Sequence, residues 1–313
     1  MLLESPKKKL IIILCVAVGF LFAINSLAFS GKSKGKFYPP DQVGPYSIGH
    51  TTVILTDTSR NLDGSTPVTP EGRFLHLDIW YPTTEKTTEH VAYTWNNPLY
   101  NENPDGLVYP GLPDLPPLIS EGSRSLNHVL DEAPLAQNGN FPLLVASHGS
   151  LVSSAKNMPD TLETLASHGY LVASVEHTGN NDAYYQASVL GLTPNPSIQQ
   201  EGTILQRTKD VSFVIDQFLQ EAVDQETGIA FSEQIDAEKI GVLGFSLGGQ
   251  TSLAMVTGIG SAGHPADHRV KAAFMGGGTN WGFFSTNGGR ASGAPLSWAC
   301  ETATTAWSVA GLS

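Results

Sequence analysis

The segment around Ser246 restricts the possible folds of this chain more than any other feature. An apolar stretch at 240–243 runs into Gly244-Phe245-Ser246-Leu247-Gly248-Gly249, and a helix of small residues is expected over 251–255. A strand that turns sharply into a helix at a serine strains the backbone of that serine. Strand and helix then approach so closely that the residues two positions before and after must be small. Gly244 and Gly248 meet this requirement, so we interpret Ser246 as the serine of a nucleophile elbow.

Strands and helices are predicted to alternate on both sides of this turn. Apolar runs that read as buried strands are separated by helical patterns at 159–168 and 207–223. This order is typical of a parallel sheet with helices on both faces. Two segments with period-2 alternation come first and predict an antiparallel N-terminal hairpin. The predicted hairpin strands are 51–55 and 74–81, and the predicted parallel strands are 141–147, 170–176, 240–243 and 270–275.

Two long segments without periodicity interrupt the pattern, at about 83–140 and 178–206. Long excursions from a compact domain tend to be functional. The second leaves the carboxyl end of a predicted parallel strand, where ligands bind in open α/β sheets. Two interpretations of the segment 178–206 remain open: it covers the substrate, or it is an ordinary connecting loop.

The N-terminus has the pattern of a secretory signal peptide. Lys7-Lys8-Lys9 precede an apolar run at 10–24, and small residues suited to cleavage follow at Ala28 and Ser30. We predict a leader over 1–30, a linker over 31–43 and one folded domain over 44–313, exported to the periplasm or secreted. The alternative is an uncleaved anchor over 10–29, because that stretch is nearly long enough to span a bilayer. A transient membrane association through this segment is then expected.

Composition excludes some classes of function. The formal net charge is −12, so the chain offers no general attraction to the phosphates of nucleic acid. Cys15 lies in the predicted leader, which leaves Cys300 as the only cysteine of the exported chain. No intramolecular disulfide is therefore expected.

A serine hydroxyl becomes a nucleophile only beside a base, and the oxyanion that forms needs preorganised donors. The backbone N–H of Leu247, directly after the serine, is one expected donor. The loop that follows the strand 141–147 is expected to supply the second, and His148 and Gly149 stand at its start. We expect His148 to form a local hydrogen bond that shapes this loop, because the catalytic base of such a site follows the serine in the chain.

These residues together resemble the platelet-activating-factor acetylhydrolase-like and dienelactone-hydrolase-like branch of the α/β-hydrolases. The likeness spans about 74–280, and it lies in four stretches and their order: Asp78-Ile79-Trp80-Tyr81-Pro82, Ser147-His148-Gly149, Val175-Glu176-His177, and 207–219 leading to the elbow. The resemblance implies an α/β-hydrolase fold and a serine esterase that cleaves carboxylic esters through an acyl-enzyme. Short acyl or phospholipid acetyl esters, small-molecule or lipid, are the implied substrates, with no metal and no organic cofactor.

The same resemblance implies roles for single residues. Ser246 would be the nucleophile, and the backbone N–H groups of Ser150 and Leu247 would form the oxyanion hole. His177 is interpreted as a structural or pocket-lining histidine, and Arg207 with Asp210 as a surface ion pair of little energetic weight. Amide, thioester and lactone substrates stay open, because the same groups serve all these acyl transfers.

The pattern departs from that family after Ser246. The acid and the histidine of such a site are expected downstream, yet the stretch 272–278 holds no carboxylate and no histidine follows His268. His264 and His268 precede the strand 270–275, so we expect them at the opposite end of the sheet from Ser246. No strand is recognisable after Gly277. We therefore leave acid and base unassigned and expect a C-terminally truncated or frame-shifted domain, with a catalytically silent scaffold or fragment as the alternative function.

Overall fold

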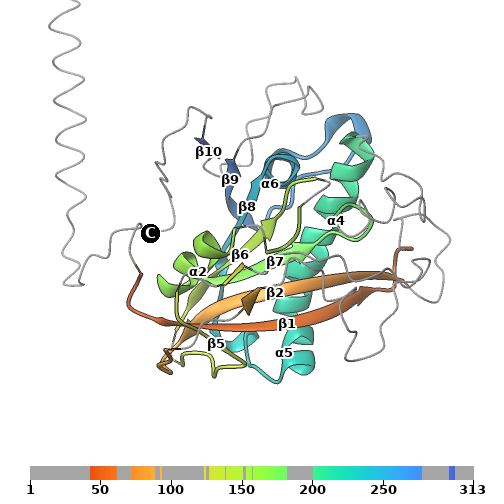
Figure 1. Cartoon of the computed structure of the whole chain (residues 1–313). Coiled ribbons are helices and arrows are strands. Elements are labelled where there is room, and N and C mark those ends of the chain that lie inside the picture. Colours follow the sequence, from red (N-terminus) through yellow and green to blue (C-terminus); the bar gives the residue numbers. More distant parts are fainter. Residues whose placement is uncertain are drawn as a thin grey trace, which may run out of the picture. The chain divides into compact units, whose positions relative to one another are not determined.

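The computed structural model describes residues 43–61, 72–88, 92–93, 123–124, 127–137, 139–150, 153–156, 158–181, 200–276 and 296–299 (Figure 1). The predicted leader, nearly all of the predicted linker, Cys300 and most of both excursions lie outside these residues. No helix in the described ranges is long and apolar enough to cross a membrane.

One sheet of eight strands carries the fold, in the order β10-β9-β8-β6-β7-β2-β1-β5. Its five strands from β10 to β7 run parallel, as the alternating pattern predicted. The carboxyl ends of neighbouring parallel strands therefore meet at one edge of the sheet. The parallel strands are β6 (Phe141–Ser147), β7 (Leu171–Glu176), β8 (Ile235–Phe245), β9 (Val270–Gly276) and β10 (Leu296–Ala299).

The predicted antiparallel hairpin is present as β1 (Ser47–Asp57) and β2 (Arg73–Thr83). β2 also pairs antiparallel with β7 and so joins the hairpin to the parallel strands. The excursion expected over 83–140 holds more structure than predicted, because β5 (Val129–Asp131) pairs with β1 at the sheet edge. Two short strands, β3 (Ala92–Tyr93) and β4 (Ser123–Arg124), form a second sheet.

Helices cover both faces of the sheet, as predicted. Side chains alternate along β6, so that Leu143 and Val145 belong to one core cluster and Leu144 and Ala146 to the other. The helix α2 (Pro159–Ser167) covers the second cluster. The first cluster is covered by α4 (Gln200–Leu219), α5 (Ala222–Thr227) and α6 (Leu247–Thr257).

The helix predicted over 207–223 differs from the structure at both ends. It begins at Gln200, so the second excursion ends at residue 199 rather than 206. The first turn contains Gly202 and polar residues, which weaken a helical signal. The helix ends at Leu219 because Glu221 has a φ of 62°, in the left-handed region. Two short 3₁₀ helices complete the described part of the fold: η1 (Ser232–Gln234) precedes β8, and η2 (Gly260–Ala262) lies between α6 and β9.

The prediction that no strand follows β9 was wrong. β10 pairs in parallel with β9, with Leu296 opposite Ala273 and Ala299 opposite Gly276. The strand is four residues long and contains Ser297 and Ala299, too short and too mixed to show a period. Its backbone pairing with β9 defines this strand, and such pairing produces no pattern in the four residues themselves.

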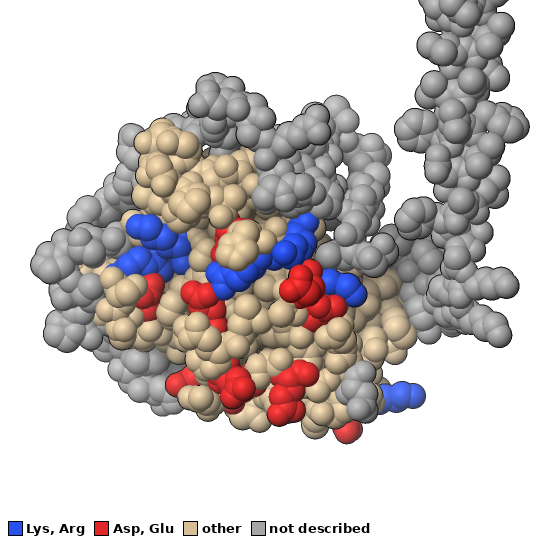
Figure 2. Space-filling model, turned by 180° about the vertical axis from the view of Figure 1, so that it is seen from behind, with Lys and Arg blue, Asp and Glu red and all other residues tan. Residues whose placement is uncertain are grey.

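Charged side chains of both signs lie close together on the face opposite to that of Figure 1, as Figure 2 shows. Among the described residues, the guanidinium of Arg269 forms ion pairs with Asp216 and Asp267. Such mixed surface pairs contribute little to stability individually.

Candidate active site

Ser246 lies at the turn between β8 and α6 with φ 54° and ψ −118°, a conformation that side-chain-bearing residues rarely adopt. A Cβ atom placed on Gly244 would lie 2.3 Å from the backbone of Gly248. One placed on Gly248 would lie 1.8 Å from the carbonyl oxygen of Ser147. The strained turn and its two required glycines are therefore present as predicted, whereas the nucleophilic role of Ser246 stays a prediction.

The loop after β6 lies directly beside this serine. A Cβ atom built on Gly149 would come within 3.7 Å of the Cβ of Ser246. The backbone N–H groups of Gly149, Ser150 and Leu247 have no hydrogen-bond acceptor among the residues that the structure describes. These are the kind of donors that an oxyanion requires.

His148 shapes the loop by local hydrogen bonds, as the sequence indicated. Its Nδ1 atom donates to the carbonyl oxygen of Gly149 at 2.7 Å, and its Nε2 atom accepts from the backbone N–H of His177 at 3.1 Å. Burial and the nearby Arg207 guanidinium hold the pKa of His148 well below its ordinary value. The ring is therefore neutral and one nitrogen can accept while the other donates.

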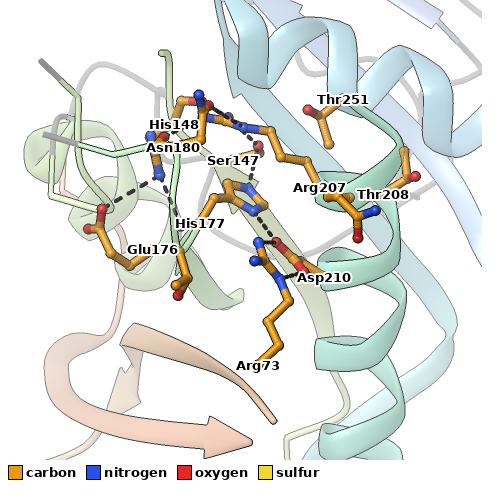
Figure 3. A network of polar contacts seen from close by, with 12 residues as sticks. Arg73, Ser147, His148, Glu176, His177, Asn180, Arg207, Thr208, Asp210 and Thr251 are labelled. Carbon is orange, nitrogen blue, oxygen red and sulfur yellow. Dashed lines mark hydrogen bonds and ion pairs between the residues drawn. The ribbon is translucent and has the colours of Figure 1, made fainter. Parts of the chain in front are cut away.

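The interpretation of Arg207 and Asp210 as a surface ion pair was wrong. Both side chains are buried, with 1% and 0% of their area exposed, and within the described ranges they form no ion pair with each other. Figure 3 shows the guanidinium of Arg207 reaching from α4 to the loop, where it donates to the carbonyl oxygens of His148 and Gly149. It also donates to the side chain and the carbonyl of Asn180.

Asp210 instead forms a buried chain of hydrogen bonds with His177 and Ser147 (Figure 3). Its carboxylate accepts from His177 Nδ1 at 2.9 Å, and His177 Nε2 lies 2.9 Å from the Ser147 hydroxyl. Burial opposes the charge of Asp210, but its ion pair with Arg73 holds its pKa well below the ordinary value. Burial and Arg207 lower the pKa of His177 to about 3. His177 is fully buried in this chain, which fits the structural alternative of its predicted role.

Glu176 is the second buried carboxyl group near the loop. It accepts from the backbone N–H of Ala155 at 2.8 Å, and its other oxygen lies 3.6 Å from Nε2 of His148. Burial raises its pKa to about 8, so it holds a proton at neutral pH.

A cavity of about 240 Å³ opens on the α2 side of the loop. Gly149 and neighbouring loop residues line it, and Phe245 contributes from the elbow. Phe245 is 45% exposed. Ala146, Ala155, Met158 and Leu162 provide apolar lining, and Ser153, Ser154 and Ser174 provide polar lining. The cavity is therefore suited to a small, partly apolar group held beside Gly149 and Phe245, the residue that precedes Ser246.

The described residues place no catalytic base at Ser246. None of them hydrogen-bonds to its hydroxyl. His264 and His268 lie before the amino end of β9, whereas Ser246 follows the carboxyl end of the parallel neighbour β8, as expected. Across the same ranges, no group of three or more His, Cys, Asp or Glu side chains could hold a metal ion.

Sequence reasoning missed the contact between Arg207 and the loop. One signal for it exists, because Arg207 lies four residues before Val211 and so shares the apolar stripe that continues through Val214 and Phe218. A cation on the buried face of a helix must find partners inside the protein. The pattern does not say which partners.

Three of the solved structures that are similar to this chain illustrate the likeness, each with a TM-score below 0.5. A ferulic acid esterase from Streptomyces cinnamoneus is 24% identical with a TM-score of 0.47, and the match covers 76% of this chain and 60% of that one. The esterase Est22 is 14% identical, with a TM-score of 0.36 and coverage of 72% and 43%. A putative dipeptidyl aminopeptidase IV from Bacteroides ovatus is 15% identical, with a TM-score of 0.37 and coverage of 78% and 23%. The chain thus spans between about a quarter and three fifths of these proteins.

The comparison with curated proteins returned no match. A family model described as platelet-activating factor acetylhydrolase, isoform II, matches residues 32–209, more than half of the chain. The match includes the hairpin, β6, the loop and Arg207, and it ends before Ser246. With the strand order and the elbow of an α/β-hydrolase fold already in place, this chain belongs to the platelet-activating factor acetylhydrolase isoform II family.

Proposed function

We propose that this protein hydrolyses carboxylic esters through an acyl-enzyme formed on Ser246. The observation that carries the proposal is the position of Ser246 in a strained elbow, beside a loop whose N–H groups have no acceptor in the described part of the chain. Membership of an acetylhydrolase family supports the same chemistry.

The geometry supports the usual two steps of acyl transfer. The Ser246 oxygen attacks the ester carbonyl carbon, and the negative charge that forms on the carbonyl oxygen is stabilised by the N–H groups of Leu247 and Ser150. The alcohol leaves with a proton, and water then releases the acid from the acyl-enzyme. The hydroxyl proton needs a general base, which no described residue supplies.

We propose that the substrates are esters with short acyl groups. The 240 Å³ cavity beside the loop is small and is partly lined by apolar side chains, which suits an acetyl or another short chain. Small-molecule esters and phospholipid acetyl esters share that acyl group, and we propose both as substrate classes.

The test is turnover of p-nitrophenyl acetate and labelling by a fluorophosphonate probe. We expect both in the wild-type chain and neither in Ser246→Ala, because the probe bonds to an activated serine oxygen. Ser212→Ala is the matched control, since this serine lies on α4 and hydrogen-bonds to Asp267. Equal turnover in wild type and Ser246→Ala would refute the proposal.

A catalytically silent scaffold is the second candidate, and the lack of a base at Ser246 among the described residues favours it. Such a protein would bind short esters without releasing product. Thermal unfolding separates the two, because a ligand of the folded state raises the Tm whether or not it is cleaved. A Tm increase without turnover or labelling would support the scaffold.

We also propose that the protein is exported. The support is the basic flank and apolar run at 7–24, followed by small residues. Expression with a C-terminal tag, fractionation and N-terminal sequencing test this proposal. A new N-terminus after Ala28 or Ser30 indicates a cleaved leader, whereas an intact chain in the membrane fraction indicates the anchor.

A further inference from the structure

We propose that Arg207 is the positioning residue of the oxyanion hole. Its buried guanidinium holds the carbonyl groups of His148 and Gly149 on the inner side of the loop, so that the N–H groups of the same two peptide units face the other way, toward the reacting oxygen. This inference rests on the proposed ester hydrolysis at Ser246, and it assigns a function to a residue outside the nucleophile and its donors.

The orientation follows from the geometry of the peptide bond. In a trans peptide the C=O and N–H groups point in opposite directions. Arg207 binds the carbonyl oxygens of two successive peptide units, those of His148 and Gly149. The N–H groups of Gly149 and Ser150 belong to these same units and therefore point away from Arg207.

Among the described residues, nothing occupies these N–H groups, which leaves them for a ligand. Neither Gly149 nor Ser150 donates its backbone N–H to any acceptor in the described ranges. An N–H group without a partner is unfavourable unless water or a ligand binds it. Gly149 lies beside Ser246, so a substrate oxygen near the serine can accept from this side while Leu247 donates from the other.

The shape of the guanidinium explains why arginine occupies this position. Its fork reaches both loop carbonyls, while Nε and one terminal nitrogen bind Asn180. A fork with fixed geometry fixes the relative orientation of the two peptide units, which a single flexible donor cannot do. The Gly149 carbonyl also accepts from His148 Nδ1, so two donors restrain it.

The charge of Arg207 adds to this effect. Every hydrogen bond that the guanidinium forms in the described part of the chain goes to a neutral oxygen, although the side chain is buried. Burial lowers the pKa of Arg207 to about 9, which leaves it charged at neutral pH. The Asp210 carboxylate stabilises this charge through space only, and the direct partners of the guanidinium are neutral oxygens, which an uncharged donor could also bind. A cation at the carbonyl end polarises a peptide unit and strengthens its N–H as a donor.

Crystal structures and kinetics of Arg207→Gln and Arg207→Lys test the proposal. In Arg207→Gln we expect at least one of the two peptide units to turn. We also expect kcat for p-nitrophenyl acetate to fall by about 10²–10³, as when an oxyanion donor is removed, with KM nearly unchanged. Arg207→Lys keeps the charge without the fork, so it should recover part of kcat. Arg269→Gln, a surface arginine paired with Asp216 and Asp267, is the control and should match the wild type.

The outcomes separate this inference from the proposed function. If the wild type shows no turnover that depends on Ser246, the proposed function fails, and the peptide orientation in the Arg207 variants still decides the present inference. Unturned peptide units in a folded Arg207→Gln protein, or a change confined to KM, would overturn it. If Arg207→Gln does not fold, Asn180→Ala replaces it, because it removes the side-chain acceptor of Nε. In that variant we expect kcat to fall about 10-fold, less than when a whole oxyanion donor is removed, because the guanidinium keeps its bonds to the loop. An unchanged kcat would contradict the inference.

Discussion

The hydroxyl oxygen of Ser147 lies 2.9 Å from Nε2 of His177, and Nδ1 of the same ring lies 2.9 Å from the Asp210 carboxylate. This is the bonding pattern of a serine triad, formed at a serine other than that of the elbow. Ser147 is 2% exposed, and the pKa of His177 is about 3. So weak a base does not activate a hydroxyl at neutral pH. These hydrogen bonds instead fix the end of β6 at Ser147, from which the loop starts.

We therefore predict that a fluorophosphonate labels Ser246 and leaves Ser147 unmodified. Ser246 stands at a turn beside N–H groups that have no acceptor among the described residues, while Ser147 contacts His177 and Arg207. Peptide mapping of the labelled protein by mass spectrometry locates the adduct. Ser147→Ala removes the hydrogen bonds to His177 and Arg207, and labelling should persist at a rate reduced by no more than about 10-fold, because neither bond involves the reacting serine. An adduct on the peptide that contains Ser147 would contradict the assignment.

Gly248→Ala is predicted to destabilise the protein severely. The new Cβ would lie 1.8 Å from the Ser147 carbonyl oxygen and 2.7 Å from that of His148, and backbone atoms cannot move aside as a flexible side chain can. We expect a loss of at least about 3 kcal/mol in the free energy of unfolding, at the upper end of overpacking effects. Urea denaturation measures it.

Gly263→Ala serves as the comparison for that variant. Gly263 has a φ of 62° and open space around its Cβ position, so alanine there meets only the left-handed backbone penalty of about 1–2 kcal/mol. Equal losses in the two variants would show that the close approach at Gly248 is relieved by movement of the loop.

The sequence predicted those parts of the site that are local in the chain. The elbow is a run of consecutive residues, and its two glycines are required by contacts between the strand and the helix that it joins. The hairpin likewise follows from alternation within each strand. The contacts of Arg207 join residues 58 and 59 positions apart, and the pairing of β10 is carried by the backbone. Periodicity shows that Arg207 lies on a buried face, and only the fold shows what it meets there.

Glu176 gives a prediction about pH. The pKa of its carboxyl group is raised from an ordinary 4.5 to about 8, with burial as the main cause. Between these values the folded state binds more protons than the unfolded state, so stability declines as the pH rises. The contribution of Glu176 is complete below about pH 4.5 and is lost as the pH rises through about 8.

Glu176→Gln removes this titration while keeping an acceptor for the N–H of Ala155. Relative to that variant, we expect the wild type to lose stability between pH 5 and pH 8, with a slope of at most about 1.4 kcal/mol per pH unit. Urea denaturation at several pH values measures the difference in the free energy of unfolding. The contributions of the buried histidines cancel in this difference, because both proteins contain them. For Glu238→Gln, a change at an exposed position, the free energy of unfolding should depend on pH in the same way as for the wild type. Parallel curves for Glu176→Gln would rule out a protonated Glu176.

Met158 borders the cavity beside the loop, and its truncation should change the preferred acyl chain. Met158 precedes α2 and makes no capping hydrogen bond through its side chain, so Met158→Ala removes volume without removing a cap. We expect the ratio of kcat/KM for p-nitrophenyl butyrate to that for the acetate to rise about 10-fold, because each of two newly buried methylenes contributes about 0.8 kcal/mol. Leu165→Ala, on the same helix but outside the cavity, should lower stability and leave the ratio unchanged. An unchanged ratio in Met158→Ala would mean that the acyl chain lies elsewhere, because a substrate group in this cavity must respond to the loss of one of its walls.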